Sequence, residues 1–179
     1  MIFNNLIMNE IEQTNKIKIL EELQINGRAS ASEIADKLGL SKQTVAKIIS
    51  NMEKKKEIWG YTTIFNSKLV GKKPFILLIK TDLYKSNKDF LNKVTSLDVI
   101  KNNEELHGFN TTIFLHGLYD IMIILWAKDI IQAKKLVNSY HQFYKEYIKE
   151  IHLYDVLATI RNNRIVNPNM MEELTNLLI

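Results

Sequence analysis

Apolar residues recur at helical spacing in the first third of the chain. Ile17, Leu20 and Leu23 follow one another about every three residues, which predicts a helix over residues 15–25. We expect this helix to begin near Asn15.

Two further helices are marked by their capping residues. Ser30 and Glu33 have the spacing of a capping box, in which the hydroxyl accepts from the Glu33 amide and the carboxylate reaches back. Ser41 is placed to cap a third helix. Gly39 and Leu40 alone separate the second helix from that cap, and so short a connection forces a steep crossing. The pattern predicts a helix-turn-helix.

The third predicted helix has two different faces. Val45, Ile48 and Met52 are spaced to lie on one apolar side that faces the core. The opposite side is polar and carries Lys42, Gln43, Lys47, Asn51 and Lys54.

The second half of the chain alternates between strand-like and helix-like patterns. We expect, in order, a strand over 75–83, a helix over 88–97, strands over 110–116 and 120–127, a helix over 129–147 and a strand over 150–160. This β-α-β-β-α-β order is that of the ferredoxin-like split motif. Residues 98–109 fit no element well and are expected to form an enlarged loop or a helix extension.

These patterns predict an α+β protein with a winged-type helix-turn-helix followed by a ferredoxin-like βαββαβ sandwich. The expected organisation has four parts: a helix-turn-helix domain over 1–60, a linker strand over 61–73, a ferredoxin-like dimerisation or effector-binding domain over 74–160, and a tail over 161–179. A short tail helix is expected from Met170.

Charge and composition point to a cytoplasmic protein with an acidic partner. The 179 residues carry a formal net charge of +4 and no cysteine, which excludes disulfides and thiolate metal sites. A mild positive charge favours nucleic acid as a partner. The longest apolar run, residues 121–127, is far too short for a membrane span. The N-terminus lacks the basic and small-residue features of a secretory signal.

Catalytic and metal-binding signatures are missing from the sequence. There is no glycine-rich phosphate loop and no Ser-His-Asp arrangement, so we expect no catalytic residue and no cofactor. No two of the four histidines stand four residues apart, and a metal site is not expected. Trp59 and Trp126 are interpreted as packing residues. An aromatic stripe on the long helix is interpreted as core or oligomer interface and consists of Tyr140, Phe143, Tyr144 and Tyr147.

Several stretches resemble the Lrp/AsnC family, the feast/famine transcription regulators. They are ILEELQINGRAS (19–30), SEIADKLGLSKQTVAKII (32–49), EIWGY (57–61) and GLYD (117–120). The resemblance implies binding to double-stranded DNA as a homodimer, with dimers assembling further into tetramers or octamers. It also implies an amino acid or similar small molecule as effector.

The helix-turn-helix supplies the candidate DNA-binding residues. Side chains near the start of a recognition helix reach base edges in the major groove, and here these are Lys42, Gln43, Thr44 and Lys47. Ser41 stands at the helix N-terminus, where free amides suit a phosphate. Arg28 and Lys54 are placed to neutralise phosphates at the edges. The alternative interpretation is a merely solvated helix face.

The GLYD turn supplies the candidate effector-binding residues. By the resemblance, Gly117, Tyr119 and Asp120 lie near the effector, where the glycine allows close approach and the carboxylate accepts from a ligand ammonium. The alternative is structural, since Gly117 makes a tight hairpin and Asp120 caps it.

Two other functions use the same two modules. Siroheme decarboxylases are similar to this family and are enzymes, but the arginine-rich stretch that we would expect after the helix-turn-helix is replaced here by IWGYTTIFN (58–66). A non-DNA effector-binding protein is the second alternative. Visible absorbance from a bound porphyrin distinguishes the first, and loss of salt-dependent DNA affinity distinguishes the second.

Overall fold

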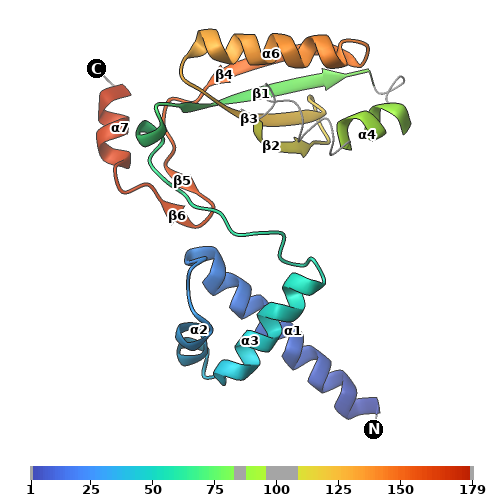
Figure 1. The fold of residues 1–179 in the computed structure, drawn as a ribbon, viewed down its shortest axis with the longest axis vertical. Coiled ribbons are helices and arrows are strands. Elements are labelled where there is room, and N and C mark those ends of the chain that lie inside the picture. Colours follow the sequence, from blue (N-terminus) through green and yellow to red (C-terminus); the bar gives the residue numbers. More distant parts are fainter. Residues whose placement is uncertain (1, 83–87, 96–108, 178–179) are drawn as a thin grey trace. The chain divides into compact units, whose positions relative to one another are not determined.

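The structure is a computed structural model that describes residues 2–82, 88–95 and 109–177 (Figure 1). The chain divides into two compact units. One unit contains residues up to Ile64 together with Thr159–Asn176, and the other contains Phe65–Ala158 with the last three residues.

The helix-turn-helix unit contains helices α1 (Ile2–Ile25), α2 (Ala31–Leu38) and α3 (Lys42–Lys54). The unit also holds a short hairpin of β5 (Arg161–Asn162) and β6 (Ile165–Val166), and most of α7 (Met170–Leu177). The three predicted helices and the tail helix are confirmed.

Helix α1 begins much earlier than predicted, at Ile2 instead of near Asn15. Residues 10–14 of this helix are exposed. Apolar residues already recur at helical spacing before Asn15, at Phe3, Ile7 and Ile11, so the prediction began the helix too late.

The core of this unit comes from α1, α2 and α3. Six residues are buried in it: Ile19, Ile34, Ala35, Val45, Ile48 and Met52. The predicted apolar face of α3 is therefore confirmed. Leu40, in the turn between α2 and α3, is partly buried against this cluster, and its amide donates to the Ala35 carbonyl oxygen at 3.0 Å.

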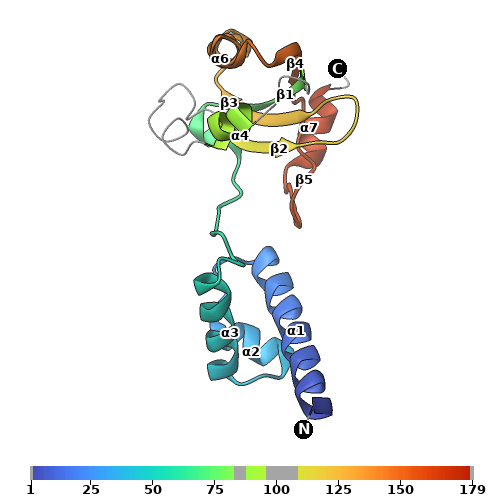
Figure 2. The same ribbon diagram turned by 90° about the vertical axis from the view of Figure 1, so that its right-hand side faces the viewer.

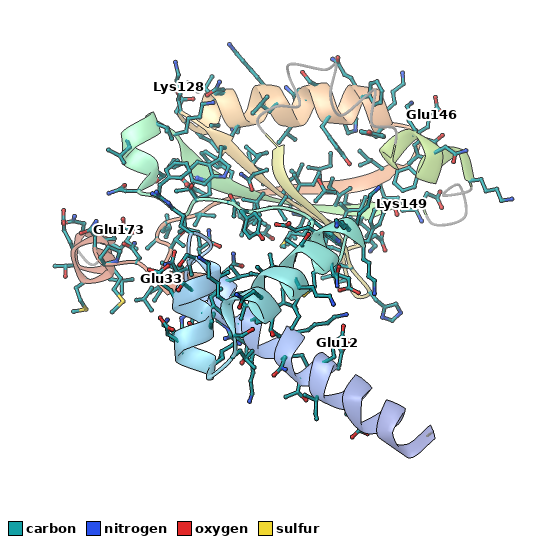
Figure 3. The ribbon with its side chains drawn as sticks, turned by 60° about the horizontal axis from the view of Figure 1, so that its bottom comes forward. Glu12, Glu33, Lys128, Glu146, Lys149 and Glu173 are labelled. Atoms are coloured by element: carbon teal, nitrogen blue, oxygen red, sulfur yellow. The ribbon has the colours of Figure 1, made fainter. Side chains whose placement is uncertain are left out.

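The predicted capping residues are also confirmed. The Ser30 amide donates to the Glu33 carboxylate at 2.6 Å, and the Glu33 amide donates back to the Ser30 hydroxyl at 3.2 Å. The bond from the Ser30 amide is the main reason why the pKa of Glu33, labelled in Figure 3, is lowered. Gly39 ends α2 in a left-handed conformation with φ of 65°.

The second unit is built on one four-stranded sheet. Its strands are β1 (Lys73–Thr81), β2 (Phe109–Phe114), β3 (Ile121–Ala127) and β4 (Ile148–Asp155). They pair antiparallel in the order β2-β3-β1-β4. Helices α4 (Lys88–Thr95) and α6 (Ile130–Tyr144) complete the predicted β-α-β-β-α-β order, which confirms the ferredoxin-like fold.

The two faces of this sheet differ in their cover. Side chains alternate along β1 and β3, and one set, which includes Phe75, Leu77 and Leu125, is fully buried. Helix α6 lies along one face of the sheet (Figures 1 and 2). Two residues of its aromatic stripe, Tyr140 and Tyr144, join the buried cluster, so the core interpretation is confirmed.

The other set of alternating side chains on β1 and β3 is only partly buried, although most of it is apolar. It comprises Ile76, Leu78, Lys80, Met122, Ile124 and Trp126. We call this set the open sheet face. Trp126 is covered within the unit by Phe65, whose ring centroid lies 5.6 Å from its own.

The predicted linker strand over 61–73 is wrong. Residues 61–66 have no regular structure, a 3-10 helix (η1) covers Ser67–Val70, and Gly71 has a φ of 59°. β-branched and aromatic residues favour extended structure only where a neighbouring strand supplies hydrogen bonds, and this segment has no such neighbour within the described part of the chain.

The packing interpretation is also wrong for Trp59, which is 96 % exposed. The predicted loop or helix extension over 98–109 lies almost wholly outside the described residues. Among the residues that are described, no helix is long and apolar enough to cross a membrane.

Candidate nucleic-acid interface and effector loop

The proposed base-reading residues share the exposed side of α3. Lys42, Gln43, Thr44 and Lys47 are all exposed. Their backbone is held by the Ser41 cap, whose hydroxyl accepts from the Thr44 amide at 3.1 Å and lies 2.8 Å from the Thr44 hydroxyl. The cap thus fixes the first turn of α3, from which three of these side chains project.

The phosphate-contacting candidates flank this surface along the chain. Arg28 is exposed in the turn between α1 and α2, where its amide donates to the Asn26 side chain at 3.0 Å. Lys54 is exposed in the last turn of α3, at the opposite end from Ser41. The structure therefore brings the first-turn candidates together and leaves Lys54 three turns away along the same helix.

Ion pairing separates the cations of this unit into two groups. Lys37 pairs with Glu22 at 2.6 Å, and Lys16 pairs with Glu57 at 3.5 Å. In contrast, no ion pair within the described residues involves any of four candidates, Arg28, Lys42, Lys47 and Lys54. Because no described residue pairs with their charge, these side chains remain available to phosphate and base acceptors.

One contact of this unit was not anticipated from the sequence. The Tyr61 hydroxyl donates to the Glu53 carboxylate at 2.9 Å, which ties the segment after α3 back onto that helix. Burial is the main cause of the raised pKa of Tyr61, followed by this hydrogen bond. The sequence marks Tyr61 only as the last residue of the EIWGY stretch and does not indicate this hydrogen bond.

The GLYD turn lies between β2 and β3 at one end of the sheet. Gly117 has no left-handed φ, and a Cβ at this position would meet nothing within 4 Å. The turn therefore does not require a glycine.

Asp120 is tied into the sheet by hydrogen bonds. Its carboxylate accepts from the Thr81 amide at 2.7 Å and from the Thr81 hydroxyl at 3.0 Å. Its amide donates to the Ile79 carbonyl oxygen at 2.9 Å, and its own carbonyl oxygen accepts from the Leu115 amide at 2.7 Å. Asp120 thus joins the ends of β1, β2 and β3, which is the structural role weighed above against effector binding.

Tyr119 lies beside the end of β4. Its ring meets the His152 ring edge-on at 5.5 Å between centroids. Its hydrogen bond with Tyr154 is the main cause of its raised pKa. Tyr119 and Asp120 therefore contact different strands, and Gly117 is the exposed member of the three.

Replacing Asp120 with alanine is expected to lower the free energy of unfolding by about 1–3 kcal/mol, because the buried Thr81 loses its acceptor. Thermal unfolding followed by circular dichroism measures the change. The matched control is Asp155→Ala, which removes an exposed ion pair to Lys73 and should cost less than about 1 kcal/mol. Equal melting temperatures for both variants would contradict a structural role of Asp120.

No group of three or more metal-ligating side chains that could hold an ion occurs in the described part of the chain.

A family model described as winged helix-turn-helix DNA-binding matches residues 12–55. The chain is 31% identical over 119 residues to the HTH-type transcriptional regulator LrpA of Pyrococcus horikoshii. This match covers 66% of this chain and 77% of LrpA.

Two solved structures extend the likeness over both units. The crystal structure of PH0061, also from Pyrococcus horikoshii, has a TM-score of 0.69 at 20% identity and covers 84% of this chain and 96% of that one. A transcriptional regulator of Neisseria meningitidis, NMB0573, solved with L-Met, has a TM-score of 0.63 at 18% identity and covers 88% and 97%.

The match to LrpA shows similarity in sequence, and the solved structures show the same two-module fold. The helix-turn-helix, the βαββαβ sheet and the GLYD turn stand in the order that the resemblance implies. This chain belongs to the Lrp/AsnC family of transcriptional regulators.

Proposed function

We propose that this regulator binds duplex DNA through the exposed side of α3, with Lys42, Gln43 and Lys47 contacting bases and Arg28 and Lys54 contacting phosphates. One observation carries the proposal: the candidate cations lack carboxylate partners in the described residues, whereas Lys16 and Lys37 of the same unit are paired. Glutamine suits adenine, and lysine suits the acceptors of guanine.

The regulator acts as a homodimer, paired through the open sheet face. An antiparallel sheet with one face in water normally alternates apolar with polar residues. Here Ile76, Leu78, Met122 and Ile124 give the open face an apolar centre as well, and an equivalent sheet of a second copy would cover it. A two-fold dimer places two recognition helices on successive turns of one duplex face.

A small effector, an amino acid or a related compound, binds at the GLYD turn. The relative NMB0573 was solved with L-Met. In this chain Gly117 is exposed and has open space around it, so the carboxylate of an amino-acid ligand has room to approach. Because Asp120 already accepts two bonds from Thr81, Gly117 and Tyr119 are the better candidates for contact.

The protein works as a non-enzymatic regulator in the cytoplasm. Support comes from its relatives, which are transcriptional regulators, and from the DNA-binding type of its first unit.

The test is a titration of the full chain into labelled duplex from upstream of its own gene and into scrambled duplex, at several salt concentrations. Preferential binding that weakens steeply with salt is expected. Footprinting should show two protected half-sites about 34–36 Å apart. Absence of binding to either duplex at low salt, with and without amino acids, would overturn the proposal.

A further inference from the structure

A β-hairpin from the far end of the chain belongs to the helix-turn-helix unit. In this C-terminal hairpin (residues 161–166), Arg161 pairs with Val166 and Asn162 with Ile165. Asn163 opens the connecting turn with a φ of 53°, a conformation that asparagine tolerates. All four residues of the RNNR stretch over 161–164 are exposed.

The base of this hairpin is held by Asn167. Its side-chain amide donates to the Thr159 carbonyl oxygen and to the Glu173 carboxylate, both at 2.9 Å. Its backbone amide donates to the Ile160 carbonyl oxygen at 2.9 Å. Glu173 comes from α7 and is labelled in Figure 3. Because these bonds already order the hairpin, it loses little conformational entropy when it binds a partner.

The tip of the hairpin is attached to the last turns of α1. Arg164 lies 3.5 Å from the Glu21 carboxylate, and α1 ends four residues later, just before Arg28. The chain has only three arginines. Arg28 lies in the turn between α1 and α2, and the other two, Arg161 and Arg164, lie in the hairpin that contacts α1. Arg161, unlike Arg164, forms no ion pair with any described residue.

This corner has a defined place in DNA recognition. When the second helix of a helix-turn-helix enters the major groove, the first helix crosses the sugar-phosphate backbone. Here that first helix is α2, and Arg28 stands three residues before its first residue, Ala31. Beyond a phosphate backbone lies the adjacent minor groove, which proteins contact with arginine, lysine, asparagine and glutamine side chains.

The helix-turn-helix also lacks its wing in the usual place. The matching family is described as winged, but residues 55–66, which follow α3 and are all described, form no strand. The C-terminal hairpin is the only strand pair among the described residues of this unit.

We infer that the C-terminal hairpin is the wing of this helix-turn-helix and contacts the minor groove beside the stretch of duplex read by α3. Arg161 and the two asparagines at the tip face the DNA, and Arg164 fixes the hairpin to α1 through Glu21. The inference rests on the proposed DNA-binding function.

The experiment compares full-length Arg161→Ala with wild type in the same salt-dependent titration. Losing one cationic side chain that neutralises the phosphates flanking the minor groove lowers the slope of log K against log salt by about 1. In a hydroxyl-radical footprint, protection of the minor groove beside the α3 site should be lost while the α3 site stays protected. Lys134→Ala, an exposed lysine on α6, is the control of equal charge change.

A second variant tests the attachment without touching the DNA-facing residue. Glu21→Ala frees Arg164 from α1 and should therefore also weaken protection of the minor groove beside the α3 site. This loss is expected even though the substitution removes a negative charge that repels DNA. A gain in affinity with unchanged flanking protection would overturn the role of this contact.

The outcomes separate the two proposals. If Arg161→Ala and Lys134→Ala both match the wild-type slope and footprint, while changes on α3 weaken binding, the wing is overturned and the DNA-binding function stands. If the wild-type chain does not bind duplex at all, both fall. A slope and footprint change confined to Arg161→Ala supports the wing.

Discussion

Replacing Lys42 and Lys47 together with alanine is expected to weaken binding to the preferred duplex by about 30-fold or more. Each good contact to a base contributes about 1–3 kcal/mol, so the lower estimate for two such contacts already corresponds to this factor. Both side chains are exposed on α3 and have no ion pair to break within the described residues. Fluorescence anisotropy at fixed salt measures the change.

The matched control removes the same charge from the other unit. Lys134 and Lys135 are adjacent exposed residues of α6, and their joint replacement by alanine should leave affinity nearly unchanged once general charge effects are screened at moderate salt. If both double variants weaken binding equally, the net charge of the chain and not the α3 surface accounts for its affinity.

The salt dependence of affinity distinguishes lysines that contact bases from lysines that contact phosphates. A lysine that contacts only phosphate reduces the slope of log K against log salt by about 1 and weakens binding to all sequences equally. A lysine that reads a base reduces the preference for one sequence over the scrambled duplex. The single variants Lys42→Ala and Lys47→Ala therefore assign each side chain its role.

Local features were predicted correctly because their causes lie within a few residues. The Ser30 and Glu33 capping box, the left-handed Gly39 and the Ser41 cap each depend on bonds that span no more than five residues. The amphipathic face of α3 is likewise set by side-chain spacing alone. These local features place the proposed DNA-contacting surface almost completely.

Features that need a distant partner were not predicted. Residues 61–72 have the composition of a strand but pair with no described strand, so strand propensity was misleading there. Asp120 is held by Thr81, which lies 39 residues earlier in the chain. Nothing near either residue reveals that bond.

The C-terminal hairpin was not predicted from the sequence, for the same reason. Its attachment to α1 depends on Arg164 meeting Glu21 across 143 residues of sequence. The signal that was available is compositional, because two of the three arginines of a lysine-rich chain stand within four residues of each other. Arginine is used where a planar, forked donor is needed.

Replacing Ile19 with alanine is expected to destabilise the helix-turn-helix unit by about 2–5 kcal/mol. Ile19 is fully buried in the small cluster that joins α1 to α2 and α3. Proteins have about 0.05–0.15 kcal/mol of stability per residue, so a unit of about 80 residues has roughly 4–12 kcal/mol to lose. DNA binding should therefore weaken steeply on warming, although no proposed DNA-contacting residue is changed.

Ile17→Ala is the matched control, because it makes the same chemical change on the same helix two residues away, at a side chain that is 52% exposed. Its cost should lie within about 0.5 kcal/mol. Urea unfolding of both variants measures the difference, with DNA affinity recorded at two temperatures. The sheet unit has a separate core, so its unfolding transition should stay in place in both variants. If Ile19→Ala instead unfolds both units in one shifted transition, the two cores are energetically coupled and the loss of DNA binding is not a property of the helix-turn-helix alone.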